Sequence, residues 1–387
     1  MSTTTPSEPP AQPGLLRSLN NRTVLRLLIE HGTLTRGEVR ELTGLSKPTA
    51  SQLLTRLEEA GLVEPNGFGE TGPGGRAPQR YRIVGSAGHA AAIDVRPGAL
   101  HTRIADITGR VVGTAVSDPT GGAVADTIAA LDAACRAAGI ERTDLDAVVI
   151  GAPGSFDAVD DRLRYAEHLA GWQHDGITAA IGAGLPGAVV AIENDVNLVA
   201  IAEQHLAGEA DGGDGDFFLL WLDERVGGAL VIDGTIYRGH RGAAGEAAFL
   251  LPSGVEPDAG TRVDGGFERL VGESAVSALA GAAAAGRPAA EAMAVVAADP
   301  ALLARLARRY AIGVASVIAL LDPARIVIAG GLTAVGGEPL RAAIAAELDD
   351  LVITAPPVVL SAGSDAPILD GGLIMSLDHA RASVFST

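Results

Sequence analysis

The sequence is poor in the residues that form disulfides, metal–thiolate clusters and membrane spans. Its 387 residues include a single cysteine, Cys135, which can form neither an internal disulfide nor a thiolate cluster. Aromatic residues make up only 3%, and the eight histidines lack the close spacing of a zinc or iron site. The longest apolar run of helical period, residues 310–321, has about 12 residues, whereas a membrane span needs roughly 20. A disulfide scaffold and a transmembrane protein are therefore excluded.

The N-terminus and the charge distribution indicate a cytoplasmic protein whose two parts have different functions. Residues 1–14 have neither a basic stretch nor an apolar one, so they predict a disordered lead rather than a signal peptide. The net charge is −18. Residues 1–84 carry ten Lys or Arg and eight Glu, a balance of +2, which leaves −20 for the rest. A slightly basic head on a strongly acidic body suggests that only the head binds nucleic acid.

Three helical segments follow one another near the N-terminus. Apolar residues recur at helical spacing over residues 21–32, 35–45 and 46–63. Thr35 begins the pattern of a capping box before the second helix, and Ser46 is placed to cap the third. Two helices joined by a short turn form the arrangement whose second helix enters a major groove. The pattern therefore predicts a helix-turn-helix.

Residues 61–85 contain two strand-like runs with a Gly- and Pro-rich segment between them. This pattern predicts a wing. Arginines of such a wing meet phosphates or a minor groove. The predicted DNA contacts are Ser46, Lys47, Thr49, Ser51, Gln52, Arg76 and Arg80. A small three-helix protein-interaction module is the alternative, but the polar helix entrance with an arginine-bearing wing favours DNA. We expect a winged helix-turn-helix domain of α+β class over residues 15–84.

One order of elements occurs twice in the rest of the chain. Three strand-like runs precede alternating helices and strands, first from residue 89 and again from residue 215. This repetition predicts two α/β lobes, over residues 88–200 and 215–387, with a cleft between them. Ligands in such sheets bind at the carboxyl ends of strands.

Five segments carry a resemblance to a known family. They are GGRAPQRYRI (74–83), IGAPGSFD (150–157), IENDVN (192–197), GHRGAAGEAAFL (239–250) and LLDPARIVIAGGL (320–332). In this order they resemble the ROK family (repressors, open reading frames and kinases), in its regulator branch. The resemblance spans roughly residues 15–380 and implies an N-terminal winged helix followed by a two-lobed, actin-like or ribonuclease H-like sugar-kinase fold over residues 88–387.

The resemblance also implies which residues bind sugar. In the family's kinases the Asn and Asp of an END motif contact sugar hydroxyls, and the Asp is the general base. Asn194 and Asp195 match this pair. Glu246 and Glu268 match two further sugar-binding glutamates of the family.

Helix capping is the competing explanation for the polar residues at 193–197, because Asn and Asp often cap a helix after a strand. Capping explains Asn197 as well as ligand binding does. It is weaker for Asn194 and Asp195, since several acidic and amide groups are expected to converge and sugar hydroxyls are natural donors to buried carboxylates. Glu193 is expected to be structural.

Two features of the family's kinases are altered in this sequence. Phe249 stands where the family has a zinc-binding His, and no cysteines follow it, so we predict no metal. The first phosphate loop reads DVRPG, in which Pro97 removes an amide donor and blocks close approach. The second reads DERVGG, in which Asp223 and Glu224 would repel phosphates. We therefore predict no nucleotide cofactor and no enzymatic activity.

Together these patterns predict a sugar-responsive transcriptional regulator, a repressor of carbohydrate-related genes. The expected partners are a carbohydrate effector and an operator, palindromic because a two-fold homodimer or a homotetramer would present paired heads. No membrane association is expected. The alternatives are an active ATP-dependent sugar kinase with a fused DNA-binding domain, and a regulator that responds to a phosphosugar or a protein partner.

Overall fold

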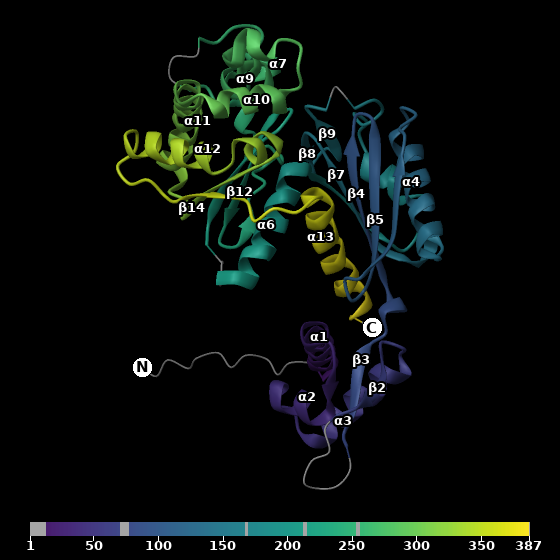
Figure 1. Cartoon of the computed structure of the whole chain (residues 1–387). Helices are drawn as coiled ribbons and strands as arrows, with labels where there is room; N and C mark the ends of the chain where they lie inside the picture. Colours follow the sequence, from purple (N-terminus) through teal and green to yellow (C-terminus); the bar gives the residue numbers. More distant parts are fainter. Residues whose placement is uncertain (1–12, 70–76, 167–168, 212–214, 253–255, 387) are drawn as a thin grey trace, which may run out of the picture.

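The computed structural model describes residues 13–69, 77–166, 169–211, 215–252 and 256–386. Figure 1 shows a small N-terminal head below two larger lobes, with helices α6 and α13 between the lobes. We call these parts the head (residues 13–84), the first lobe (residues 89–194) and the second lobe (residues 217–360). No helix in the described part of the chain is long and apolar enough to cross a membrane.

The head contains three helices and a small antiparallel sheet, and its caps form as predicted. The Thr35 side chain accepts a hydrogen bond from the Glu38 amide, and the Glu38 carboxylate accepts one from the Thr35 amide. The Ser46 hydroxyl accepts the Thr49 amide at the start of the third helix. The elements are α1 (Pro13–His31), β1 (Leu34–Thr35), α2 (Arg36–Thr43), α3 (Lys47–Glu59), β2 (Val63–Phe68) and β3 (Gln79–Ile83), and β3 pairs with both other strands.

The first lobe is a five-stranded sheet in the order β10-β7-β4-β5-β6. Strands β4, β5 and β6 are antiparallel, whereas β7 and β10 run parallel to β4 because helices connect them. The lobe's elements are β4 (His89–Arg96), β5 (Ala99–Asp106), β6 (Val111–Ser117), α4 (Ala123–Ala138), η2 (Arg142–Asp144), β7 (Leu145–Ala152), β8 (Ser155–Asp157), β9 (Arg162–Arg164), α5 (Ile177–Gly182) and β10 (Val189–Asn194).

The second lobe repeats this topology in the order β13-β12-β11-β14-β15. Again three antiparallel strands are followed by two parallel ones, which confirms the repetition predicted from the sequence. Its elements are β11 (Phe217–Leu222), β12 (Val226–Ile232), β13 (Thr235–Ile236), η3 (Ala247–Phe249), α7 (Thr261–Asp264), α8 (Gly266–Val271), α9 (Glu273–Ala280), η4 (Gly281–Ala284), α10 (Ala289–Ala298), α11 (Pro300–Leu321), β14 (Arg325–Ala329), α12 (Gly331–Asp349) and β15 (Val358–Leu360).

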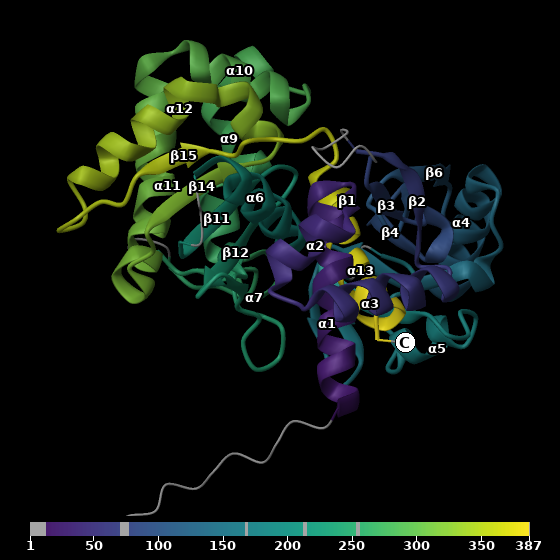
Figure 2. The ribbon, with the colours of Figure 1, turned by 90° about the horizontal axis from the view of Figure 1, so that it is seen from below.

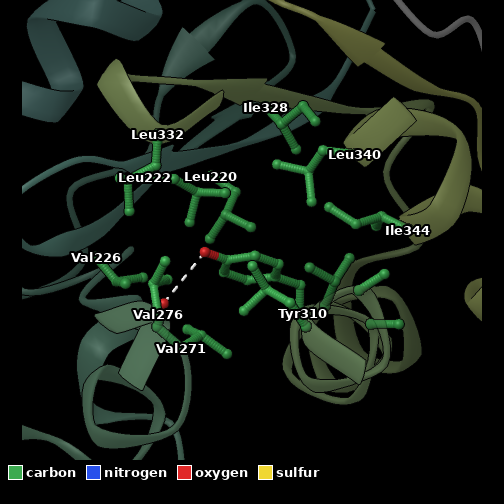
Figure 3. Close-up of a cluster of buried hydrophobic side chains, with 14 of the residues drawn as sticks. Leu220, Leu222, Val226, Val271, Val276, Tyr310, Ile328, Leu332, Leu340 and Ile344 are labelled. Atoms are coloured by element: carbon green, nitrogen blue, oxygen red, sulfur yellow. Dashed lines mark hydrogen bonds between the residues drawn. The ribbon is translucent and has the colours of Figure 1, made fainter. Parts of the chain in front are cut away.

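The core of the second lobe lies between its sheet and helices α8 to α12. Figure 3 shows Tyr310 of α11 surrounded by apolar side chains from the strands and from α12. The Tyr310 ring is fully buried, and its hydroxyl donates to the Val271 carbonyl at 3.1 Å. A buried tyrosine hydroxyl needs such a partner, because leaving it unpaired would cost about 1–3 kcal/mol.

Two helices connect the lobes with the head. Helix α6 (Asp195–Asp211) packs along α13 (Pro367–Val384), and Leu198 lies against Gly371 at the crossing. The other end of α13 reaches the head, as Figures 1 and 2 show, where Arg22 of α1 donates to the Ala382 carbonyl. Phe385 lies in one apolar cluster with the core of the head. The linker η1 (Gly85–Ala87) is held against the first lobe by the Ile107 amide.

Candidate functional site

The entrance to α3 presents the DNA contacts predicted from the sequence. Lys47, Thr49 and Gln52 are exposed, and Ser51 is half-buried. The Ser46 and Thr49 hydroxyls lie 2.8 Å apart and share a hydrogen bond. The residues from Ser46 to Gln52 thus form one polar surface at the N-terminal end of α3.

The sequence analysis missed two residues of this surface. Thr55 and Arg56 line a hollow of about 390 Å³ together with Ser51 and Gln52. They lie about one helical turn beyond Ser51 and Gln52, so the spacing of three to four residues on one helix face could have identified them. The Arg56 guanidinium also donates to the Asn21 side chain at 3.2 Å, which links α3 to α1.

The structure gives Arg80 of the wing strand contacts within the head. Its guanidinium donates to the Thr33 hydroxyl at 2.8 Å and to the Thr33 carbonyl at 2.6 Å, and lies 3.5 Å from the Glu38 carboxylate. These contacts fasten β3 to the segment between α1 and β1. A contact of Arg80 with DNA stays a prediction, and Arg76 lies outside the residues that the structure describes.

Asp195 and Glu246 come together at the boundary of the two lobes. Asp195 opens α6 directly after β10, and Glu246 precedes the one-turn helix η3. Burial raises the pKa of Asp195 to about 6, and the Asp94 carboxylate adds to the effect. Burial raises the pKa of Glu246 to about 7, and the neighbouring Asp195 raises it further. Two half-buried carboxylates near enough for the charge of Asp195 to act on Glu246 could accept hydrogen bonds from a neutral polar ligand.

Asn194 is the N-cap of α6, although the sequence analysis considered capping weaker for Asn194 than for Asn197. The Asn194 side-chain oxygen accepts the Asn197 amide at 3.0 Å, and its Nδ2 donates to the Gly154 carbonyl at 2.9 Å. For Asn197, where capping and ligand binding had been left open, the side chain donates to Glu193 at 2.9 Å. A sugar contact of Asn194 stays a prediction, to be made with its remaining N–H and lone pair.

Glu193 is structural, as expected. Its side chain is 6% exposed and its carboxylate accepts from Arg238 at 2.7 Å, from the Asn197 side chain at 2.9 Å and from the Asn194 amide at 3.0 Å. Arg238 follows β13, so this ion pair joins the second lobe to the strand end that carries Asn194 and Asp195.

Glu268 lies on α8, which packs against η3, but one of its oxygens is already bound. Glu268 Oε2 accepts the Val226 amide at 2.6 Å. Burial raises the pKa of Glu268, and the Val226 amide and Arg225 oppose the rise. The positive charge of Arg225 also acts to lower the pKa of Glu246. The sequence analysis missed Arg225, because it treated the DERVGG segment only as a phosphate loop.

The two segments that the sequence analysis compared with phosphate loops, DVRPG and DERVGG, carry opposite charges that act on each other. The Arg96 guanidinium donates to Asp94 at 2.8 Å, and Asp94 is only 2% exposed. Burial acts to lower the pKa of Arg96, but Asp94, Asp223 and Glu224 outweigh it and raise the pKa. Burial raises the pKa of Asp223, and the amide of Gly331, the first residue of α12, partly offsets the rise. An internal carboxylate therefore faces the helix N-terminus that would otherwise suit a phosphate.

A shallow hollow of about 520 Å³ lies elsewhere on the first lobe, beside β10 and α5. Apolar residues dominate its lining, and none of the four predicted sugar-binding residues belongs to it. Its polar side chains are Asp161 and Thr178, and both Asp161 oxygens already accept backbone amides. We therefore take the carboxylates at the lobe boundary as the candidate site, since several polar groups are expected to converge there. Within the described ranges, no three His, Cys, Asp or Glu side chains are grouped to hold a metal.

Comparison with known proteins gives two family matches and several relatives. The ROK family profile matches residues 111–369, and the MarR family profile matches residues 18–71. The xylose repressor of Caldicellulosiruptor bescii is 25% identical over 239 residues, 60% of this chain and 58% of that protein. The match therefore spans less than two thirds of that relative's length. A beta-glucoside kinase of Listeria innocua is 30% identical over 113 residues, 29% of this chain and 37% of that protein.

Solved structures agree with the fold. A ROK family transcriptional regulator, described as a homolog of the Escherichia coli MLC protein, superposes with a TM-score of 0.74 at 19% identity, covering 96% of this chain and 99% of that one. The ROK hexokinase of Thermus thermophilus gives a TM-score of 0.61 at 26% identity, covering 76% of this chain and 99% of that one. The profile match spans more than half of the chain and includes Asn194, Asp195, Glu246 and Glu268. The chain therefore belongs to the ROK family.

Proposed function

We propose that this protein is a sugar-responsive repressor that binds operator DNA through its head and a carbohydrate between its lobes. The observation that carries the proposal is the presence of two half-buried carboxylates, Asp195 and Glu246, on either side of the lobe boundary in a chain that also carries a helix-turn-helix. The Glu246 carboxylate has no hydrogen-bond or ion-pair partner in the described part of the chain, and sugar hydroxyls would supply the missing donors. The named repressor among the relatives supports the same function.

The proposal includes a palindromic operator, a homodimer or homotetramer, and a cytoplasmic location where operator DNA is accessible. Two heads related by a two-fold axis would contact half-sites about one helical turn, or a multiple of it, apart. The acidic body would repel DNA and restrict binding to the heads.

An operator can be selected from a random duplex library with the full chain and then used in gel shifts with a panel of sugars. We expect one neutral sugar to weaken the operator complex. Asp195→Asn should abolish this response and leave operator binding without sugar unchanged, because Asp195 lies far from α3 in the fold. Asp118→Asn, an exposed carboxylate on the first lobe, is the matched control. Loss of operator binding in a folded Asp195→Asn protein would contradict the assignment.

We further propose that the protein is not a kinase, although kinases occur among its relatives. Pro97 offers no amide donor in the first loop, and the Asp223 carboxylate already accepts the Gly331 amide in the second, whereas a triphosphate would need free amides and low negative charge. ADP release in the presence of ATP and the effector sugar should equal that of Asp195→Asn. Turnover that depends on Asp195 would restore the kinase alternative.

A further inference from the structure

An aromatic contact joins the two lobes beside the candidate sugar site. Tyr165 directly follows β9 in the first lobe, and Phe249 ends η3 in the second. Their ring centroids lie 5.3 Å apart, and their planes are inclined by 43°. Such a tilted arrangement is typical of an attractive ring pair. Because aromatic residues make up only 3% of the chain, a contact between two aromatic rings across the lobe boundary is unusual for this protein.

Backbone contacts place this ring pair next to the predicted sugar residues. On the first-lobe side, the Tyr165 backbone lies against Gly154, whose carbonyl accepts the Asn194 side chain at 2.9 Å. On the second-lobe side, the Phe249 amide donates to the Glu246 carbonyl at 3.1 Å. Asn194 is followed by Asp195, whose charge raises the pKa of Glu246. The rings and the polar residues therefore border the same part of the lobe boundary.

Tyr165 is held in a conformation that exposes its ring. Its φ is +59°, in the left-handed region that a bulky residue rarely adopts, and it remains 48% exposed. Such a strained conformation persists only where the surroundings impose it. The β8–β9 ribbon does so, because Asp157 of β8 binds both Arg164 of β9 and Arg241 of the second lobe. Figure 1 shows this ribbon on the side of the first lobe that faces the second.

We propose that Tyr165 and Phe249 form an apolar wall of the effector site and select a neutral pyranose. A pyranose ring presents hydroxyls at its edge and C–H groups on its faces. Asp195 and Glu246 would accept the hydroxyls, while the exposed ring of Tyr165 would pack on a C–H face. An acyclic polyol carries the same hydroxyls without a rigid face, and a phosphosugar would bring negative charge toward the two carboxylates. Both should bind more weakly. This inference rests on the proposed sugar response.

Calorimetry on the full-length protein tests the wall directly. The probes are D-xylose, D-glucose, D-galactose and D-mannose, with xylitol, sorbitol and glucose 6-phosphate as the acyclic and charged counterparts. For the pyranose that binds most tightly, Tyr165→Asn should raise Kd roughly tenfold, because Asn tolerates a left-handed backbone but lacks the ring. Tyr165→Phe should retain the affinity, since the ring and not the hydroxyl does the packing. Phe68→Ala, an exposed aromatic residue of the head, should change nothing.

The outcomes separate this inference from the function on which it rests. A pyranose that binds wild type and Tyr165→Asn equally would overturn the wall and leave the sugar response intact. A wild-type protein that binds none of the pyranoses would overturn both. If the unfolding transition of Tyr165→Asn differs from that of wild type, its Kd is not comparable, and the Kd of Phe249→Leu is used instead. A Kd raised severalfold with Leu supports the wall, and an unchanged Kd refutes it. A polyol bound as tightly as its pyranose would also refute it.

Discussion

At the scale of single residues, the half-buried carboxylates of Glu246 and Asp195 make the free energy of unfolding depend on pH. Burial and Asp195 raise the pKa of Glu246 to about 7, and burial raises that of Asp195 to about 6. In the unfolded chain both groups release their protons near pH 4. Between about pH 4 and pH 7 the folded protein therefore binds more protons than the unfolded one. Its free energy of unfolding falls as the pH rises through that window and levels off above it.

Glu246→Gln should remove part of this penalty. We expect the variant to be more stable than wild type at pH 8, by an amount on the order of 1 kcal/mol after solvent screening, and to approach wild type toward pH 4. Urea unfolding at pH 5, 6, 7 and 8 measures the difference, with Asp118→Asn, which alters an exposed carboxylate, as the control. A stabilisation that grew toward acid pH would contradict the raised pKa values.

Lys47 is the only lysine in the sequence and lies at the start of α3, where a groove-binding helix would enter DNA. An amine-reactive reagent therefore modifies only Lys47 and the α-amino group. Operator DNA should protect Lys47 from modification, as read by mass spectrometry, while an unrelated duplex at the same concentration protects it less. Lys47→Ala should reduce the slope of log K against log salt by about 1 per protomer. Equal labelling with and without operator would exclude Lys47 from the interface.

At the scale of elements, the crossing of α6 and α13 depends on one glycine. A Cβ on Gly371 would lie 1.8 Å from the Leu198 carbonyl oxygen, and backbone at both sites leaves little room to move. Gly371→Ala should lower the free energy of unfolding by about 1–3 kcal/mol or more. Gly98→Ala is the matched control, because nothing lies within 4 Å of its Cβ position. Thermal and urea unfolding of the two variants would show the difference, and equal stability would contradict the tight crossing.

The sequence predicted elements better than contacts. Period-two and helical patterns identified both lobes, because strand order follows from connections that pack locally. The capping box at Thr35 and Glu38 was equally readable, since its two residues are three apart. Asn194 was harder to assign, because its cap role depends on where α6 begins and its second bond reaches Gly154, forty residues away. The contact of Tyr165 with Phe249 joins two lobes and has no local pattern at all.

At the scale of the whole molecule, one continuous set of contacts runs from the proposed sugar site to the head. Asp195 begins α6, α6 crosses α13 at Leu198, and α13 ends beside α1 with Phe385 in the core shared with the head. A ligand that moved one lobe relative to the other would move α6 and α13 together, because the two helices are closely packed where they cross. The head would follow, because Arg22 and Phe385 hold it to the end of α13. We therefore expect sugar and operator binding to be coupled through this helix.

Coupling between two sites is reciprocal, which makes it testable from either side. If the sugar weakens operator binding by a given factor, the operator must weaken sugar binding by the same factor. We expect the coupling free energy to be roughly 1–3 kcal/mol. Phe385→Leu should loosen the contact between α13 and the head and reduce both factors equally. It should leave sugar affinity without DNA unchanged, because Phe385 is remote from Asp195. Titrations of each ligand at saturating amounts of the other measure the two factors. A Phe385→Leu protein with full coupling would show that the signal reaches the head by another path, through the linker at Gly85–Ala87, which the Ile107 amide holds to the first lobe.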